Sequence, residues 1–196
     1  MSGRSQEGVA MVFRLDVAKA IQAAAVLLRL ESGNRMNYMR LLKLLYIADR
    51  ESLKETARPI TGDRVVAMDR GTVLSGVFDL IKGQHIDARH WDEFIETARF
   101  DVQLRGDPGN GKLSRYEIAK LQEISRRYES DDEWAMVDIT HQFEEWRRNK
   151  PQEKSSRPIP LEDILDAVGR SADKHAIIQD ASDAAAFDRF FSGRSS

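Results

Sequence analysis

The chain has 196 residues, a formal net charge of −2 from 30 basic and 32 acidic side chains, and no cysteine. This length suits one domain, which can bury enough surface to fold without a disulfide or a structural metal. The lack of cysteine excludes disulfides, thiolate zinc sites and cysteine nucleophiles, and it fits a reducing compartment such as the cytoplasm. Proteins that bind nucleic acids usually carry a clear basic excess, and this sequence does not.

No stretch of the sequence reads as a membrane span or a cleaved leader. Gln22 interrupts the apolar run of residues 20–28 and Arg29 follows it, so the run is far shorter than the roughly 20 apolar residues that a span needs. A signal peptide over residues 12–30 is the alternative, but charges are spread through that segment and no small-residue cleavage site follows it. We expect residues 1–13 to form a flexible tail.

The first third of the chain predicts two helices. Apolar residues recur at helical spacing in residues 17–28, and Gly33-Asn34 ends this helix because both residue types tolerate a left-handed backbone. Asn37 is a suitable N-cap for the second helix. We expect that helix at the centre of the core, because its apolar residues surround much of its circumference: Leu41, Leu42, Leu44, Leu45, Ile47 and Ala48.

Shorter elements are predicted in the middle of the chain. Val65 to Met68 is a β-prone run that Gly71 breaks, and Ser75 is expected to cap a short helix that ends at Gly83. Residues 86–104 favour one or two strands. Two Ser-x-x-Glu capping patterns then predict an antiparallel pair of helices, and one more helix follows a polar linker: 114–128, 130–146 and 161–168.

These elements predict a mainly α (α+β) fold, a compact helical domain of about six helices with a small antiparallel β element. We expect residues 14–169 to form this domain. The flexible tail precedes it, and a partly helical C-terminal extension over residues 170–196 follows it.

One motif suggests catalysis. Residues 106–112 match the glycine and lysine spacing of a phosphate-binding loop, so a nucleotide-binding enzyme is one alternative for the function. However, Leu113 stands where a hydroxyl group should hold magnesium, and no βαβ series builds the parallel sheet that such loops serve. We therefore expect an ordinary loop, no enzyme activity and no cofactor.

The histidines do not suggest a metal site or an enzyme either. None of them forms a His-Glu-x-x-His pair, and no cysteine completes a tetrahedral site: His85, His90, His141 and His175. His141, beside Thr140, is interpreted as a packed histidine of the core, with a catalytic base as the alternative.

Basic side chains on the second helix, over residues 35–54, suggest a nucleic-acid-binding regulator as a further alternative. They are interleaved with Asp49, Glu51 and Glu55, so we expect a solvated face whose charges pair along the helix: Arg35, Arg40, Lys43, Arg50 and Lys54. No helix-turn-helix with a free recognition helix stands out.

Several segments, read in order, resemble the Panacea domain family, also called SocA-like antitoxins, which includes the GepA-like phage-associated proteins. The first segment is LLKLLYIADR at residues 41–50, and the second is RPITGD at residues 58–63. The rest of the resemblance is carried by 66–68, Gly71, 75–83, Leu113-Ser114, Glu117, Thr140-His141 and Trp146. Together they cover roughly residues 15–168.

The resemblance implies a largely helical domain with a small antiparallel β element, and no established catalytic activity or cofactor. It also implies a cytoplasmic protein of a prokaryote or phage that neutralises a cognate protein toxin by direct binding. Some members also deliver the toxin to a protease. We expect no membrane or nucleic-acid partner. The positions that match the family motif are expected mostly to serve the fold: Lys43, Tyr46, Asp49, Pro59, Gly62, Gly71, Thr140, His141 and Trp146.

Two departures from the family pattern leave the partner open. Glu145 stands where the family often has proline before the tryptophan, and residues 71–75 lack the family's usual prolines. We expect the toxin-facing residues on an exposed rim at Arg58, Thr61 and Asp63. A C-terminal aromatic group is a candidate anchor, with folding back onto the core as the alternative: Phe187, Phe190 and Phe191.

Overall fold

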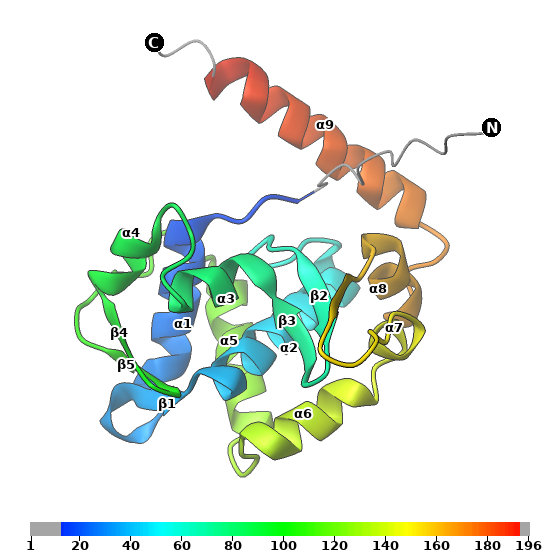
Figure 1. The fold of residues 1–196 in the computed structure, drawn as a ribbon. Coiled ribbons are helices and arrows are strands. Elements are labelled where there is room, and N and C mark those ends of the chain that lie inside the picture. Colours follow the sequence, from blue (N-terminus) through cyan, green and yellow to red (C-terminus); the bar gives the residue numbers. More distant parts are fainter. Residues whose placement is uncertain (1–12, 193–196) are drawn as a thin grey trace, which may run out of the picture.

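Helix α2 (Tyr38–Thr56) runs through the centre of the molecule (Figure 1). The computed structural model describes residues 13–192, with side chains as far as Phe187. Helices α1 (Val17–Arg29), α5 (Arg115–Arg127) and α6 (Glu133–His141) pack against α2. Residues 40–49 are all buried, so this part of α2 lies in the core on every side, as its apolar content predicted.

Local signals set the ends of the first two helices. The Asn37 side chain accepts a hydrogen bond from the backbone N–H of Met39 at 2.8 Å, which confirms the predicted N-cap. Gly33 and Asn34 both have positive φ, as expected for the segment that separates α1 from α2. Helix α2 ends at Ala57, which also adopts the left-handed conformation.

The β structure consists of two small antiparallel sheets. In the first sheet, β5 (Asp101–Leu104) lies between β1 (Arg35–Asn37) and β4 (Ile95–Ala98). In the second sheet, β2 (Val65–Met68) lies between β3 (Gly71–Leu74) and β6 (Ser156–Pro158). The mainly helical fold with a small antiparallel β element is therefore confirmed.

The hairpin β2–β3 and the helix after it differ from the prediction. Gly71 begins β3 instead of ending the β structure, and its φ of 86° suits the tight turn between the two strands. Helix α3 (Ser75–Ile81) is capped by Asp63, whose carboxylate accepts hydrogen bonds from the backbone N–H groups of Gly76 and Val77. Ser75 is therefore not the cap, because the carboxylate of Asp63, which precedes the hairpin in the chain, accepts the hydrogen bonds of the first turn of α3.

Nine helices lie in the described part of the chain, more than the predicted six. The predicted helix 130–146 is two helices, α6 and α7 (Glu144–Arg148), because the backbone of Phe143 is extended. The pattern also missed α4 (Ala88–Asp92). The predicted antiparallel pair is wrong, since α5 packs mainly on α2 and α1, and α6 packs mainly on α2 and β3.

Only one of the two predicted capping boxes forms, and this leads to a prediction. The Ser114 hydroxyl accepts from Glu117 N–H, and Glu117 accepts from Ser114 N–H, whereas Asp132 caps α6 in place of Ser130. Ser114→Ala should therefore lower the free energy of unfolding by about 1 kcal/mol. Ser130→Ala should change it by less than about 0.5 kcal/mol. Urea denaturation checks both values, and equal losses would contradict the assignment of the caps.

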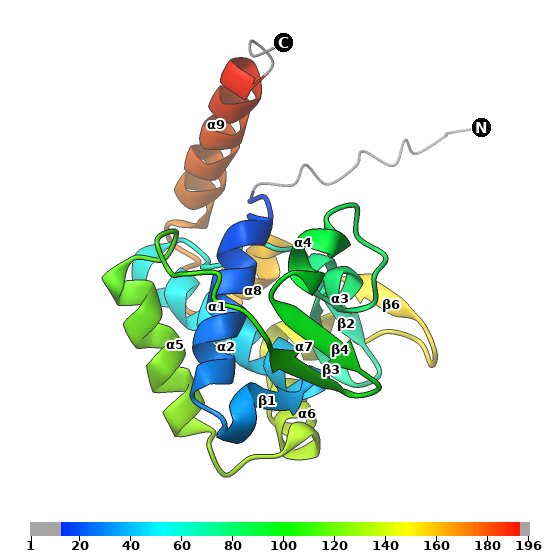
Figure 2. The same ribbon diagram turned by 90° about the vertical axis from the view of Figure 1, so that its left-hand side faces the viewer.

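The last two helices lie over a second hydrophobic cluster. Helix α8 (Leu161–Ala167) and the start of α9 (Lys174–Ser192) pack there with Trp146. Helix α9 then rises away from the rest of the molecule (Figures 1 and 2). Among the described residues, no helix is both long and apolar enough for a membrane crossing.

Candidate functional site

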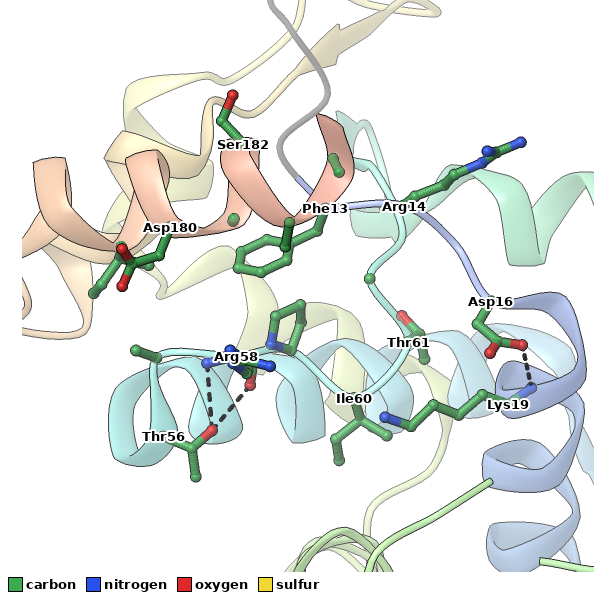
Figure 3. Close-up of a pocket in the computed structure, with 17 residues that line it drawn as sticks. Phe13, Arg14, Asp16, Lys19, Thr56, Arg58, Ile60, Thr61, Asp180 and Ser182 are labelled. Carbon is green, nitrogen blue, oxygen red and sulfur yellow. Dashed lines mark hydrogen bonds between the residues drawn. The ribbon is translucent and has the colours of Figure 1, made fainter. Parts of the chain in front are cut away.

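A groove of about 950 Å³ lies between α9, residues 56–62 and the segment that leads into α1 (Figure 3). The ring of Phe13 lies between α9 and the turn at residues 58–60. Both apolar and charged side chains line the groove, among them Arg14, Lys19, Arg58 and Asp180. It brings together one of the segments that resemble the family and the C-terminal extension.

Buried hydrogen bonds hold the turn at residues 58–62 to α2. One carboxylate oxygen of Asp49 accepts from the backbone N–H groups of Ile60 and Thr61, both at 2.9 Å, and the other accepts from the Thr61 hydroxyl. Ser52 donates its hydroxyl proton to the carbonyl of Arg58 at 2.6 Å. Burial raises the pKa of Asp49 to about 7, although the hydrogen bonds from Thr61 and Ile60 act in the opposite direction. The floor of the groove is therefore anchored from inside the core.

Gly62 brings the N-terminal segment close to this turn. Its φ is 72°, and an added Cβ would lie 2.5 Å from the backbone carbonyl oxygen of Arg14. The N–H of Asp16 also donates to the carbonyl of Thr61 at 3.3 Å. A side chain at residue 62 would separate these two segments, which explains the structural need for glycine there.

The predicted toxin-facing residues have different exposures. Arg58 is exposed and lines the groove, as expected for a rim residue. Thr61 is only 2% exposed, so its predicted place on an exposed rim is wrong. Asp63 is half-buried because it caps α3.

Of the C-terminal aromatic group, Phe187 is 63% exposed on α9, and the side chains of Phe190 and Phe191 lie outside the described part of the chain. Contact of these residues with a toxin stays a prediction.

Three of the family-motif residues form a tight contact between α2, β3 and α6. The ammonium group of Lys43 donates to the carbonyl of Thr72 at 2.6 Å, in the interior. An added Cβ at Gly71 would collide with the hydroxyl group of Thr140 and lie 3.1 Å from the Lys43 nitrogen. Gly71 thus allows α2 and α6 to close around the hairpin.

Another motif residue, Tyr46, meets its partner across the core. The hydroxyl of Tyr46 donates to Glu145 at 2.6 Å, and the guanidinium of Arg50 donates to the same carboxylate at 2.7 Å. Burial, followed by the charge of Glu145, raises the pKa of Tyr46. These contacts join α2 to α7 and therefore to the second hydrophobic cluster.

His141 packs against Trp146, as the interpretation of a packed histidine requires. The two rings are stacked with centroids 4.0 Å apart, and the indole N–H of Trp146 donates to the carbonyl of Met68 at 3.2 Å. Burial lowers the pKa of His141, which favours the neutral ring.

The basic side chains of α2 are mostly not solvated, so that expectation is wrong. Arg40 is 6% exposed and donates to the carbonyls of Asp131 and Tyr128, and to the Glu31 carboxylate. Lys43 is 2% exposed, and the Arg50 side chain is paired with Glu145. A nucleic-acid contact through residues 35–54 thus loses three of the five cations on which it depended, since only Arg35 and Lys54 are exposed.

The buried Lys43 leads to a pH prediction. Burial lowers the pKa of this ammonium from 10.5 to about 7. The unfolded chain therefore binds one more proton than the folded chain between these values, so Lys43 makes stability rise as the pH increases from 7 toward 10.5. Lys43→Met should remove this rise, while the exposed Lys54→Met should keep it. Urea denaturation of the three proteins across this range checks it, and parallel curves for the wild type and Lys43→Met would contradict it.

The loop at residues 106–112 is not arranged to cradle a phosphate. The ammonium of Lys112 pairs with Asp16 at 2.9 Å. The backbone N–H groups of Gly109 and Lys112 already donate to side chains of Asp107 and Gln22, both at 2.8 Å. In the part of the chain that the structure describes, no three His, Cys, Asp or Glu residues gather as a metal site would require.

A comparison with protein families matches residues 41–147 to the model described as "Antitoxin SocA-like, Panacea domain". No curated protein and no solved structure matches the chain. The matched residues run from the first turn of α2 to α7, so they contain both partners of the contacts that Lys43, Asp49 and Glu145 make.

Proposed function

Because this chain belongs to the antitoxin SocA-like Panacea-domain family, we propose that it acts in the cytoplasm as an antitoxin that neutralises a cognate protein toxin by binding it directly. The observation that carries the proposal is the family match over residues 41–147, which is more than half of the chain. The fold agrees with a binding role, since buried hydrogen bonds anchor to α2 the turn at residues 58–62, which carries the exposed Arg58. A preformed surface loses less conformational entropy when a partner binds.

We further propose that the toxin contacts the groove beneath α9. Arg58 presents an exposed guanidinium at its edge, and α9 supplies its opposite wall. Arginine and aromatic residues are frequent among the side chains that dominate binding energy at protein interfaces. Arg58 and the exposed Phe187 are therefore the first candidates for direct contact.

Co-expression with the products of the neighbouring reading frames tests the role. We expect one neighbouring product to arrest growth alone and to lose this effect when the chain is present. The purified pair should form a complex of fixed stoichiometry, as a binding mechanism requires. If no neighbouring product is toxic, or if the soluble, folded chain does not relieve toxicity, the antitoxin proposal is wrong.

Two variants test the groove. Arg58→Glu should weaken the complex, and so should truncation after Ala181, which keeps the packed residue Ile177 and removes the second half of α9. Arg89→Glu is the matched control because Arg89 is also an exposed arginine but lies on α4. Wild-type affinity in both folded variants would place the toxin elsewhere on the chain. The toxin's lifetime in cells then separates blocking, which leaves it intact, from delivery to a protease.

A further inference from the structure

A second cavity, of about 370 Å³, opens between the start of α2, the hairpin β2–β3 and residues 154–156. It shares no lining residue with the groove beneath α9. Half of its twelve lining residues are apolar or aromatic: Tyr38, Met39, Leu42, Met68, Val73 and Phe78. A cavity with this lining can receive one apolar side chain from outside.

Two exposed cations lie over aromatic rings beside this cavity. The Lys82 ammonium is 3.8 Å from the centroid of the Tyr38 ring, and the Arg70 guanidinium is 5.2 Å from that of Trp134. The Trp134 side chain is itself 53% exposed. Among the ion pairs of the described residues, neither Lys82 nor Arg70 has a carboxylate partner. Both cations are thus positioned but not neutralised.

The charge around the cavity is locally positive, although the whole chain is slightly acidic. The exposed cations Arg70, Lys82 and Lys154 lie beside a single acid of the lining, Asp69. The Asp69 carboxylate already accepts from the backbone N–H of Lys154 at 2.8 Å. A partner that carries negative charge is therefore complementary to this surface.

We propose that this cavity is a second protein-binding site, which receives a short acidic segment of a partner protein. An apolar side chain of the segment enters the cavity, and its carboxylates pair with Arg70, Lys82 and Lys154 at the rim. The site goes beyond the antitoxin role, because it does not depend on which protein carries the segment.

The aromatic rings help to position these cations. A cation over an exposed ring is held by only about 0.5–1 kcal/mol, so its remaining N–H groups stay available for a carboxylate. Because the ring already restricts the side chain that carries the cation, this side chain loses less conformational entropy when a partner binds. Exposed tryptophan, tyrosine, methionine and arginine are also the residue types enriched at the centres of protein interfaces.

A single-stranded nucleic acid is the other polymer that cations and aromatic rings attract. Such binding needs a free ring face for a base to stack on. Here Lys82 covers one face of Tyr38, while Tyr38 and Phe78 are both half-buried. These features favour a peptide segment.

Methyl NMR of the full chain tests the site, because Met39 and Met68 line the cavity while Met136 is fully buried elsewhere. The probe is a short peptide in which glutamate alternates with phenylalanine and leucine. We expect saturable shifts of the Met39 and Met68 signals at about millimolar peptide or below, with Met136 unchanged. The binding should weaken with added salt.

Charge reversal at the rim supplies the variant. Arg70→Glu combined with Lys82→Glu should weaken peptide binding at least about tenfold, since it replaces two attractions by repulsions. The matched control is Arg89→Glu with Arg115→Glu, the same charge change at exposed arginines of α4 and α5, which should bind as the wild type does. Thermal melts confirm that each variant is folded.

Four results would overturn the proposal. They are no shift in the wild type at several-fold millimolar peptide, an equal shift in the rim variant, equal binding of a peptide with lysine in place of glutamate, and stronger shifts of the same methyl groups with a single-stranded oligonucleotide. The first three would remove the acidic-segment site, and the last would assign it to nucleic acid. None of these results bears on toxin rescue, so the antitoxin role is tested separately.

Discussion

Glu145→Ala should lower the free energy of unfolding by about 3–5 kcal/mol. The Glu145 side chain is fully buried, and it is the shared acceptor for the hydroxyl of Tyr46 and the guanidinium of Arg50. Its removal leaves a largely buried cation and a buried hydroxyl without their acceptor, and both then bear an uncompensated cost of desolvation. For a chain of this size, the loss corresponds to a decrease in melting temperature of about 6–20 °C.

The neighbouring residue supplies the control. Glu144 forms an ion pair with Arg148 on the surface, and both side chains are substantially exposed. Glu144→Ala removes the same chemical group one position away, and it should leave the melting temperature close to that of the wild type because water replaces the partner. Differential scanning calorimetry of the two variants gives the comparison. Similar melting temperatures for both would mean that the Glu145 contacts do not stabilise the fold.

Glu145 also shows what the sequence alone could and could not predict. Its position departs from the family pattern, where proline is frequent, but no local pattern indicates what its side chain contacts. The partner Arg50 lies 95 positions earlier in the chain. Asn37 and Ser114, by contrast, cap helices through groups two or three residues away, and both caps were predicted.

The difference between contacts that are local in the sequence and contacts between distant residues also explains why the burial of charged side chains was not predicted. Polar residues on a predicted helix were interpreted as solvated, which is the usual outcome. In this fold, Arg40 and Lys43 are buried because backbone carbonyls far away in the sequence accept their hydrogen bonds: Asp131, Tyr128 and Thr72. Those carbonyls have no signature in the sequence. Thr61 was misplaced for a related reason, since its hydroxyl serves the buried Asp49.

The sequence predicts only one of the two walls of the groove. The sequence predicts Arg58 as an exposed rim residue, Gly62 as a position of the family motif, and a turn between the two. The other wall comes from α9, whose direction away from the molecule depends on how Ile177 and Ala181 pack at its base. Apolar spacing predicts that such residues are buried, but not the angle at which the helix leaves the core.

Asp49→Ala should destabilise the chain by about 3 kcal/mol or more, and it should loosen the floor of the groove. Three donors lose their acceptor at once, namely the backbone N–H groups of Ile60 and Thr61 and the hydroxyl of Thr61. Each buried donor left without a partner costs about 1–3 kcal/mol. The turn would then be tied to α2 mainly by the bond from Ser52 to the carbonyl of Arg58.

Amide hydrogen exchange gives the local readout. In the wild type, the N–H groups of Ile60 and Thr61 should exchange slowly, and in Asp49→Ala they should exchange faster than the amides of the α2 core. Asp92→Ala, at an exposed aspartate of α4, is the control and should leave both rates unchanged. Unchanged protection of Ile60 in Asp49→Ala would mean that the turn is held by packing alone.

Asp49→Asn separates hydrogen bonding from charge. Burial raises the pKa of Asp49 to about 7, so a neutral side chain is already close to the preferred state near neutral pH. The amide oxygen of asparagine can still accept from Ile60 and Thr61, and the Thr61 hydroxyl can rotate to accept from the amide nitrogen. We therefore expect Asp49→Asn to retain most of the stability and the slow exchange that Asp49→Ala loses. If both variants bind the toxin poorly but only Asp49→Ala is destabilised, the charge of Asp49 has a role in binding beyond holding the turn.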